Sequence, residues 1–325
     1  MRAVPIPVRV TGVVLVMASG LAACGDDGDT SAGSAADRPQ VVVTTSILGD
    51  IVRAVVGEQA DVEVILPLGA DPHDFEPSAR EAEAMAEADL LVVNGAGFEE
   101  GMLDIIDAAE DAGAPVLAFA DHVELREATQ EDVHEDEGEH ADEEGDEHAE
   151  DPHIWTDPAG MVGAVEAFTE RAAELDGVDA ELIGEQGAAY AAELQALDAE
   201  VEELLAGVSD DRRVLVTNHE VFGYFADRYD FEVIGTVIPS MTTNADASAA
   251  EVEALAELID AEGVPAIFGE SSSSAQLAEA LADSAGGDVE VVELFTESLG
   301  EDGSGAETYV GLIRTDAELI AEGLA

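Results

Sequence analysis

The chain has 325 residues, of which 75 are Asp or Glu and only 11 are basic, so its formal net charge is −64. All the basic residues are Arg, and this balance argues against nucleic acid and anionic membrane surfaces as partners, because phosphate binding needs basic patches. An apolar fraction of 47% argues against a disordered acidic chain, and the length suits one large or two ordinary domains. The single Cys excludes a disulfide framework and a cysteine-based zinc site.

Residues 1–23 are predicted to be a signal peptide. Arg2 and Arg9 supply its positive start, and the apolar run over 10–23 is shorter than the ~20 residues that a membrane span needs. The run ends in Leu-Ala-Ala-Cys, which resembles a bacterial lipobox with Cys24 as the lipidated residue. A buried Cys that happens to follow an apolar stretch is the alternative. Residues 24–40 are then the lipidated Cys and a flexible polar tether.

Residues 41–180 are predicted to form an α/β lobe, because short β-branched runs alternate with helical patterns. The predicted strands are 41–45, 61–66, 90–93 and 115–119, and the predicted helices are 47–56, 78–87 and 101–112. Asp157 is predicted to N-cap a further helix with Pro158 at its first position.

One long helix is predicted over 181–207, where apolar residues recur every three or four positions and no Gly or Pro stands between Gly187 and Gly207. A second α/β series follows over 211–325. Its predicted strands are 213–217, 231–234, 265–268 and 289–294, and its helices are 221–228, 249–261, 275–284 and 307–320. The predicted fold class is therefore α/β, with two similar parallel-sheet lobes joined by one long rigid helix.

Residues 131–150 interrupt the pattern of the first lobe. They contain twelve acidic residues, no basic residue and three histidines, His134, His140 and His148. So little apolar surface cannot offset the entropy of ordering, and we expect a disordered surface loop.

Three other histidines lie where ligands gather. His73 follows the second predicted strand, His219 directly follows the first strand of the second lobe, and His153 precedes a helix. In open α/β sheets ligands bind at the carboxyl ends of the strands, and three imidazoles with one carboxylate suit tetrahedral zinc. For any one of these histidines, the alternative to a metal ligand is a hydrogen-bonded loop residue. We interpret the remaining histidine, His122, as an ordinary surface residue.

Four motifs, in chain order, resemble the signatures of metal-binding solute-binding proteins of ABC transporters. They are residues 69–78 with 88–95, 151–155, 217–220 with Phe222 and Tyr224, and 294–298. The resemblance covers the mature chain and implies two α/β lobes that hold a transition metal in the cleft between them. It implies His73 and His153 as ligands from the first lobe and His219 from the second. Glu297 is the implied fourth ligand, where the family usually has Asp; a water in its place is the alternative, since Glu is one methylene longer.

The resemblance also bears on the metal. Manganese members of the family usually have Glu at the third ligand position, so His219 favours Zn²⁺, and Mn²⁺ or iron(II) is the alternative. Zinc members carry an acidic, His-bearing loop between the first two ligands. We therefore expect His134, His140 and His148 to capture metal weakly, with a merely solvated insertion as an equal alternative.

The implied function is capture of the ion outside the cell and its delivery to an ABC permease. The implied location is the outer face of the bacterial cytoplasmic membrane, with acyl chains on Cys24 as the anchor. We expect the protein to be a monomer and to bind its ligand without catalysing a reaction. A zinc hydrolase with Glu220 as general base is the alternative from another class, although no His-Glu-x-x-His helix is present. A secondary role as a surface adhesin is a third alternative. Because acidic residues are spread over the whole chain, we interpret the net charge as adaptation to high salt.

Overall fold

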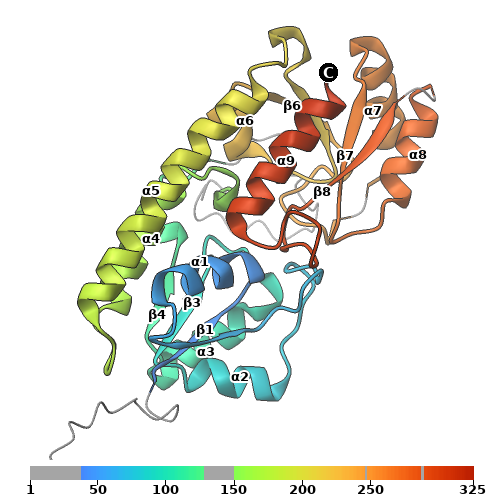
Figure 1. Ribbon diagram of the computed structural model, residues 1–325. Coiled ribbons are helices and arrows are strands. Elements are labelled where there is room, and N and C mark those ends of the chain that lie inside the picture. The colour runs from blue at the N-terminus through green and yellow to red at the C-terminus, as the bar shows by residue number, and fades with distance from the viewer. Residues whose placement is uncertain (1–37, 128–149, 246, 287–288) are drawn as a thin grey trace, which may run out of the picture. The chain divides into compact units, whose positions relative to one another are not determined.

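A computed structural model describes residues 38–127, 150–245, 247–286 and 289–325, which contain two α/β lobes (Figure 1). Each lobe has a four-stranded parallel sheet, with strand orders β2-β1-β3-β4 and β6-β5-β7-β8. The predicted fold class, with two parallel-sheet lobes, is therefore confirmed.

The first lobe begins with β1 and ends with α4. Its strands are β1 (Gln40–Val43), β2 (Asp61–Val64), β3 (Leu90–Val93) and β4 (Val116–Ala118). Its α-helices are α1 (Ser46–Val56), α2 (Ala79–Ala86), α3 (Leu103–Ala112) and α4 (Met161–Ala172), and its 3-10 helices are η1 (Glu100–Met102), η2 (Ala120–His122) and η3 (Ile154–Thr156).

The second lobe repeats the same architecture. Its strands are β5 (Val214–Thr217), β6 (Glu232–Thr236), β7 (Ala266–Glu270) and β8 (Glu290–Leu294). Its helices are η4 (Asp210–Arg212), α6 (Gly223–Tyr229), α7 (Ala249–Glu262), α8 (Gln276–Ser284) and α9 (Tyr309–Gly323).

The sheet of the first lobe is covered on both faces, which explains the uninterrupted apolar runs of its central strands β1 and β3. Val41 and Val43 of β1 join a core with α1, α4 and α5, whereas Val42 joins a separate core with α2 and α3. Successive side chains of a strand point to opposite faces, so a strand between two helical layers must be apolar at every position.

The connecting helix α5 (Ala180–Leu205) has 26 residues and is ~39 Å long at ~1.5 Å per residue. The Asp179 carboxylate caps its start by accepting hydrogen bonds from the backbone of Glu181 and Leu182. Figure 1 shows α5 running beside both lobes, and it packs on α1 and α4 of the first and on α9 of the second. At Gly187 a Cβ would collide with Thr169 of α4, so the close approach of these two helices requires glycine.

One hydrophobic core therefore runs through both lobes. Its members include Ile183 and Leu194 of α5, Val165 of α4, and Leu312 of α9, all of them fully or almost fully buried. Because the same cluster contains residues of both sheets, α5 fixes the lobes through packed side chains as well as through the covalent chain.

Direct hydrogen bonds also join the lobes. The Trp155 indole donates to the carbonyl of Thr296 at 2.7 Å, and the Tyr309 hydroxyl donates to the carbonyl of Trp155 at 2.6 Å. The backbone N–H of Leu299 donates to the Ser46 hydroxyl at 3.0 Å. These bonds are buried, so they hold the loop after β8 and the start of α9 at defined positions on the first lobe.

The predicted start of the fourth helix was wrong. Asp157 follows the 3-10 helix η3, and α4 begins only at Met161, with Gly160 as its N-cap residue and no side-chain cap. The Asp157 carboxylate instead accepts a hydrogen bond from the backbone of Ala159 within the turn before α4. The Asp157 carboxylate is therefore used by a local turn and does not cap the helix.

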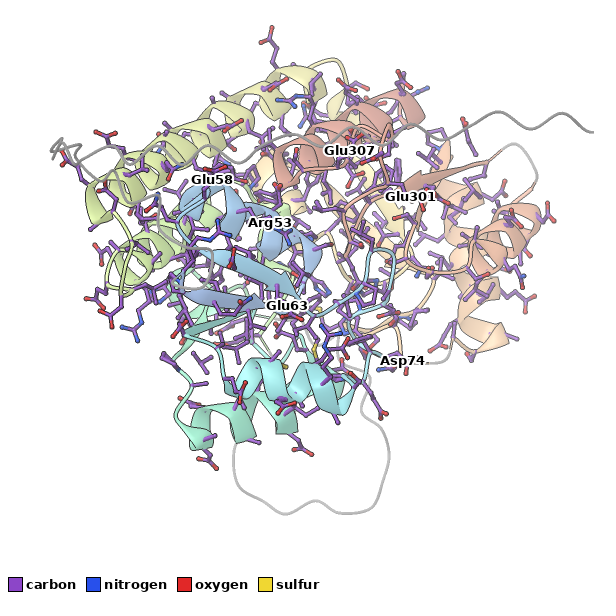
Figure 2. The ribbon with its side chains drawn as sticks, turned by 60° about the horizontal axis from the view of Figure 1, so that its bottom comes forward. Arg53, Glu58, Glu63, Asp74, Glu301 and Glu307 are labelled. Carbon is purple, nitrogen blue, oxygen red and sulfur yellow. The ribbon has the colours of Figure 1, made fainter. Side chains whose placement is uncertain are left out.

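Acidic side chains reach outward from segments far apart in the sequence, as Figure 2 shows for Glu58, Asp74, Glu301 and Glu307. The acidity of the described surface is thus not confined to one patch, and adaptation to high salt stays a prediction. Within the described ranges, none of the helices has the length and apolar character needed to cross a membrane.

The core along α5 leads to a testable prediction. Leu194→Ala should lower the free energy of unfolding by about 3 kcal/mol, because the side chain is fully buried and its removal leaves a cavity. Leu182→Ala on the same helix is the matched control, since Leu182 is 37% exposed and should cost less than about 1 kcal/mol. Urea denaturation of the metal-free protein measures both values, and equal losses would contradict the proposed role of α5.

Candidate metal centre

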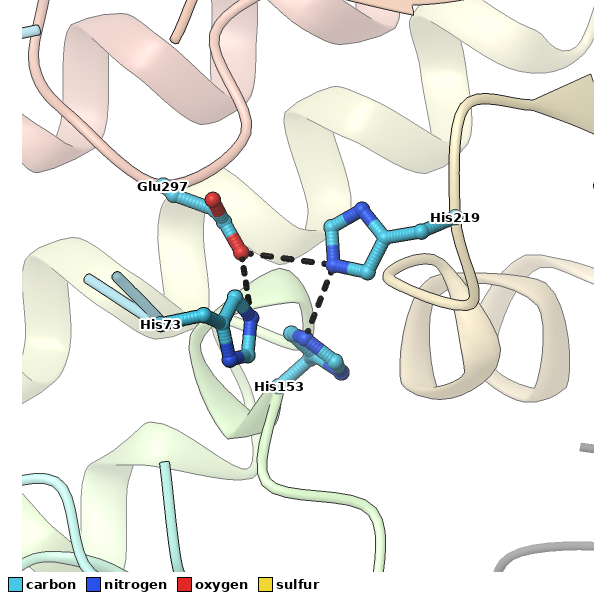
Figure 3. A group of neighbouring side chains, drawn as sticks. All are labelled: His73, His153, His219 and Glu297. Carbon is cyan, nitrogen blue, oxygen red and sulfur yellow. Dashed lines mark hydrogen bonds and ion pairs between the residues drawn. The ribbon is translucent and has the colours of Figure 1, made fainter. Parts of the chain in front are cut away.

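Four buried side chains from both lobes point toward one another, as Figure 3 shows: His73, His153, His219 and Glu297. One donor atom of each lies within 4.8 Å of the donor atoms of the others. Over the described ranges this is the one group of three or more His, Cys, Asp or Glu residues that could hold a metal ion. The structure thus brings together the four residues that the sequence motifs indicated.

Strand ends deliver three of the four. His219 is the second residue after β5, Glu297 is the third after β8, and His73 lies in the loop that follows β2. The carboxyl ends of parallel strands share one edge of their sheet, so these loops gather there. His153 comes instead from the segment just before η3, which enters the site from the first lobe.

Both Asp-Pro-His segments form the same local turn. The Asp71 carboxylate accepts a hydrogen bond from the backbone N–H of His73 at 2.9 Å, and Asp151 does the same for His153 at 3.0 Å. An Asp side chain that bonds the backbone two residues on makes an Asx-turn, which orients the His before tertiary contacts form. The repeated tripeptide therefore has a structural reason.

Three of the six spacings between the donor atoms suit a small cation, and the others lie within 4.8 Å. Oε1 of Glu297 lies 2.9 Å from Nε2 of His73 and 3.3 Å from Nε2 of His219, and the latter is 3.2 Å from Nε2 of His153. Four ligands placed tetrahedrally at the usual zinc–nitrogen distance are about 3.3 Å apart. The longer Glu side chain thus reaches the position at which the family usually has Asp.

Each imidazole has a carboxylate on its outer nitrogen. Nδ1 of His73 lies 3.1 Å from Glu100, Nδ1 of His153 lies 2.8 Å from Asp151, and Nδ1 of His219 contacts Glu270. A carboxylate that accepts a hydrogen bond from Nδ1 fixes the tautomer in which the Nε2 lone pair is free for a metal.

These three carboxylates were missed as site residues in the sequence analysis. Asp151 belongs to the motif 151–155, in which the sequence analysis assigned a role to His153 alone. Glu270 is the last residue of β7, a strand end where a carboxylate could have been noticed, whereas Glu100 is the first residue of η1, seven residues after β3. Nothing in the spacing of the sequence indicated which His each one contacts.

Aromatic rings close the inner side of the site. Phe98 packs edge-on against His73 and His153, with ring centroids 5.2 and 6.0 Å apart, and Trp155 packs against His153 at 5.4 Å. Phe98 and Trp155 are each 2% exposed. The low polarity of this wall strengthens electrostatic interactions among the charged groups of the site.

Burial and the neighbouring carboxylates shift the imidazole pKa values in opposite directions. Burial favours the neutral ring of His73, but hydrogen bonds to Glu100 and Glu297 outweigh it and raise the pKa of His73 to about 9. The pKa of His219 is likewise raised, because the charges of Glu270 and Glu297 outweigh burial. For His153 burial dominates, and the pKa is lowered despite Asp151.

The carboxyl group of Glu297 responds to the same rings. Burial alone would raise the pKa of Glu297, but the His219 and His73 imidazoles outweigh burial and lower it. In the absence of metal, protons on His73 and His219 thus supply the positive charge that the buried carboxylates require.

The other residues considered in the sequence analysis lie elsewhere. His122 is exposed, as expected of a surface residue. The carboxylate of Glu220 accepts a hydrogen bond from the Thr236 hydroxyl at 2.9 Å, which gives it a contact outside the group of four donors. Cys24, His134, His140 and His148 lie outside the described residues, so their roles stay predictions.

Two lobes that enclose a buried, nitrogen-rich donor set define a binding protein for a metal ion. The chain belongs to the family described as zinc-uptake complex component A, periplasmic, which matches residues 41–323. It is therefore a metal-binding substrate-binding protein of an ABC transporter and not an enzyme, so the hydrolase alternative is excluded.

Relatives with different named metals cover nearly the whole chain. The zinc-binding protein TroA of Treponema pallidum is 30% identical over 305 residues, which are 91% of this chain and 92% of that protein. The manganese-binding lipoprotein MntA of Halalkalibacterium halodurans is 26% identical over 314 residues, 96% of this chain and 97% of its own. The iron ABC transporter substrate-binding lipoprotein MtsA of Streptococcus pyogenes is 27% identical over 310 residues, 94% of each chain.

The fold agrees with a solved structure of one relative. The structure of TroA superposes with a TM-score of 0.77 at 30% identity, and covers 89% of this chain and 99% of that one. The family is thus established, whereas the names of its members leave the choice among zinc, manganese and iron open.

The raised pKa of His73 predicts the pH dependence of metal affinity. A proton and a metal ion compete for Nε2, so below pH 9 the metal must displace the proton, and affinity rises as pH increases. We expect the affinity for Zn²⁺ to increase about tenfold or more from pH 7 to pH 8, since one displaced proton gives a factor of ten per pH unit. Titration against a chelator of known proton affinity measures it, and a constant affinity between pH 7 and 9 would contradict the site.

Proposed function

We propose that this protein is the zinc-binding component of an ABC importer, which captures Zn²⁺ outside the cell and delivers it to the permease. The convergence of three buried Nε2 atoms and one carboxylate oxygen carries the proposal. His73, His153, His219 and Glu297 are the proposed ligands.

Ligand chemistry supports zinc over the other metals. Three imidazole nitrogens and one carboxylate oxygen are a common zinc donor set, whereas manganese favours more oxygen ligands. Three of the six spacings between the donor atoms are 2.9 to 3.3 Å and the others lie within 4.8 Å, which is close to what a four-coordinate ion needs. The 30% identical relative whose name gives zinc is in keeping with this choice.

Manganese or iron(II) is the second candidate, and one observation favours it. Oε2 of Glu297 is buried and has no hydrogen-bond partner among the described residues. If both oxygens of Glu297 bound the ion, the coordination number would rise to five, which suits manganese or iron(II) better than zinc. Relatives named for manganese and for iron are in keeping with that alternative.

We further propose that the chain works on the outer face of the cytoplasmic membrane, anchored through a lipid on Cys24. The family is one of ABC metal importers, and relatives over nearly the whole chain are named lipoproteins. All four proposed ligands come from one chain, which supports action as a monomer.

The ligand assignment predicts the effect of single substitutions. His219→Ala should weaken Zn²⁺ binding at least a hundredfold, because the remaining donors leave one side of the ion without a ligand. His122→Ala is the matched control, since His122 is exposed and outside the site, and its affinity should equal that of the unmodified protein. Competition with a fluorescent chelator measures both, and an unchanged affinity of His219→Ala would exclude the assignment.

The choice of metal predicts the result of direct competition. Zn²⁺ should displace Mn²⁺ from the protein at equal concentrations, because imidazole nitrogens dominate the donor set. X-ray absorption of the zinc-loaded protein should give four nitrogen or oxygen neighbours at about 2.0–2.1 Å. Tighter binding of Mn²⁺, or five neighbours with two carboxylate oxygens, would support the second candidate instead.

A further inference from the structure

The three carboxylates behind the imidazoles differ in how far their charge is exposed or compensated. The Glu100 side chain is 38% exposed, and its second oxygen accepts a hydrogen bond from Asn244 at 3.2 Å. The Asp151 side chain is fully buried but lies 3.3 Å from the guanidinium of Arg126. Water screens the first charge and an arginine compensates the second.

Glu270 has neither kind of compensation. Its side chain is 1% exposed, and its ionic partner among the described residues is the imidazole of His219. Its other oxygen, Oε2, is buried without a hydrogen-bond partner in the same part of the chain. A carboxylate in this position is expensive to keep ionised unless a positive charge lies close by.

The charges of the buried site can be counted from these contacts. Glu297 and Glu270 each contribute one negative charge, whereas Arg126 compensates Asp151, and the other carboxylate that Arg126 pairs with, Asp227, is 70% exposed and screened by water. With three neutral imidazoles as ligands, the buried set therefore carries two uncompensated negative charges. A divalent cation bound among the four donors neutralises both.

We propose that Glu270 is the positioning residue that adapts the site to divalent cations: it orients Nε2 of His219 toward the ion and supplies the second negative charge that the ion requires. This inference deepens the proposed function and rests on it, because it presumes that His219 is a ligand. Glu270 acts through His219, since its carboxylate contacts Nδ1 on the far side of the ring from the donor atom.

The geometry separates Glu270 from Glu100 although both make the same kind of contact. Each carboxylate lies on Nδ1 of a proposed ligand, one on His219 and the other on His73. The charge of Glu270 acts through a buried, weakly polarisable region, whereas that of Glu100 is partly screened by water. Removing the charge of Glu270 should thus cost much more affinity than removing that of Glu100.

Three isosteric or near-isosteric variants of the full chain test the proposal with Zn²⁺ as the probe. Glu270→Gln keeps the shape and an oxygen acceptor but removes the charge, and should weaken binding about 10- to 100-fold. Glu100→Gln removes the partly screened charge behind His73, and should weaken binding severalfold less than Glu270→Gln. Glu270→Asp keeps the charge on a shorter side chain, and should bind Zn²⁺ more tightly than Glu270→Gln.

The absorption spectrum of the Co²⁺-loaded protein is a second measurement, and it would not change if Glu270 only stabilised the fold. Glu270→Gln should retain the absorption of a Co²⁺ ion with the same ligands, but with a shifted band, because the basicity of His219 has changed. Equal losses for Glu270→Gln and Glu100→Gln, or a weaker affinity for Glu270→Asp than for Glu270→Gln, would overturn the proposal. Either result together with a large loss for His219→Ala would leave the proposed function intact. An unchanged affinity of His219→Ala would instead remove the proposed function itself.

Discussion

The requirement that four buried donor atoms from two lobes stay within a few ångströms of one another governs the architecture of this protein. Buried carboxylates lose their hydration, and they tolerate this only with a positive charge or hydrogen-bond donors close by. The metal site is thus a place where folding holds such groups together, with imidazole protons or a bound ion as the positive charge. Its geometry depends on how firmly the two lobes are held.

The core along α5 meets that requirement. Residues of α5 pack against α1 and α4 in one lobe and against α9 in the other, so one continuous cluster links both sheets. The bonds of Trp155 and Tyr309 then fix the loop that carries Glu297 directly against the first lobe. A donor set assembled on such a scaffold is oriented before the ion arrives, which lowers the cost of binding.

The site also shows how a chain with so many acidic residues uses few of them. Most carboxylates of the described residues face water, where they are screened and interact weakly. Glu297 and Glu270 are chemically ordinary but buried, and burial turns each into a strong determinant of the charge that the cleft accepts. Function therefore follows from the position of a carboxylate and not from the net charge of −64.

Much of the fold and the innermost side chains of the site were predictable from the sequence by itself. Apolar strands alternate with helical patterns, and the Asp-Pro-His segments carry their turn in the local chain, so His73 and His153 could be singled out. His219 was singled out because it directly follows a predicted strand, whereas Glu297 was indicated by the resemblance of residues 294–298 to a family motif. Hydrophobic periodicity and turn formation depend on residues close together in the chain, so these features could be predicted from the sequence.

Tertiary structure decided what lies between segments far apart in the chain. The contact of Glu270 with His219 joins residues 51 positions apart, and that of Glu297 with His73 joins residues 224 apart. Whether a carboxylate is screened, paired or isolated depends on everything folded around it, and no spacing along the chain records this. Even the start of α4 was set by a turn at Asp157 that competed with the expected cap. The sequence by itself thus determined which groups could bind a metal, whereas packing of the lobes decided their distances, their burial and the charge that they present, because these are properties of the assembled environment.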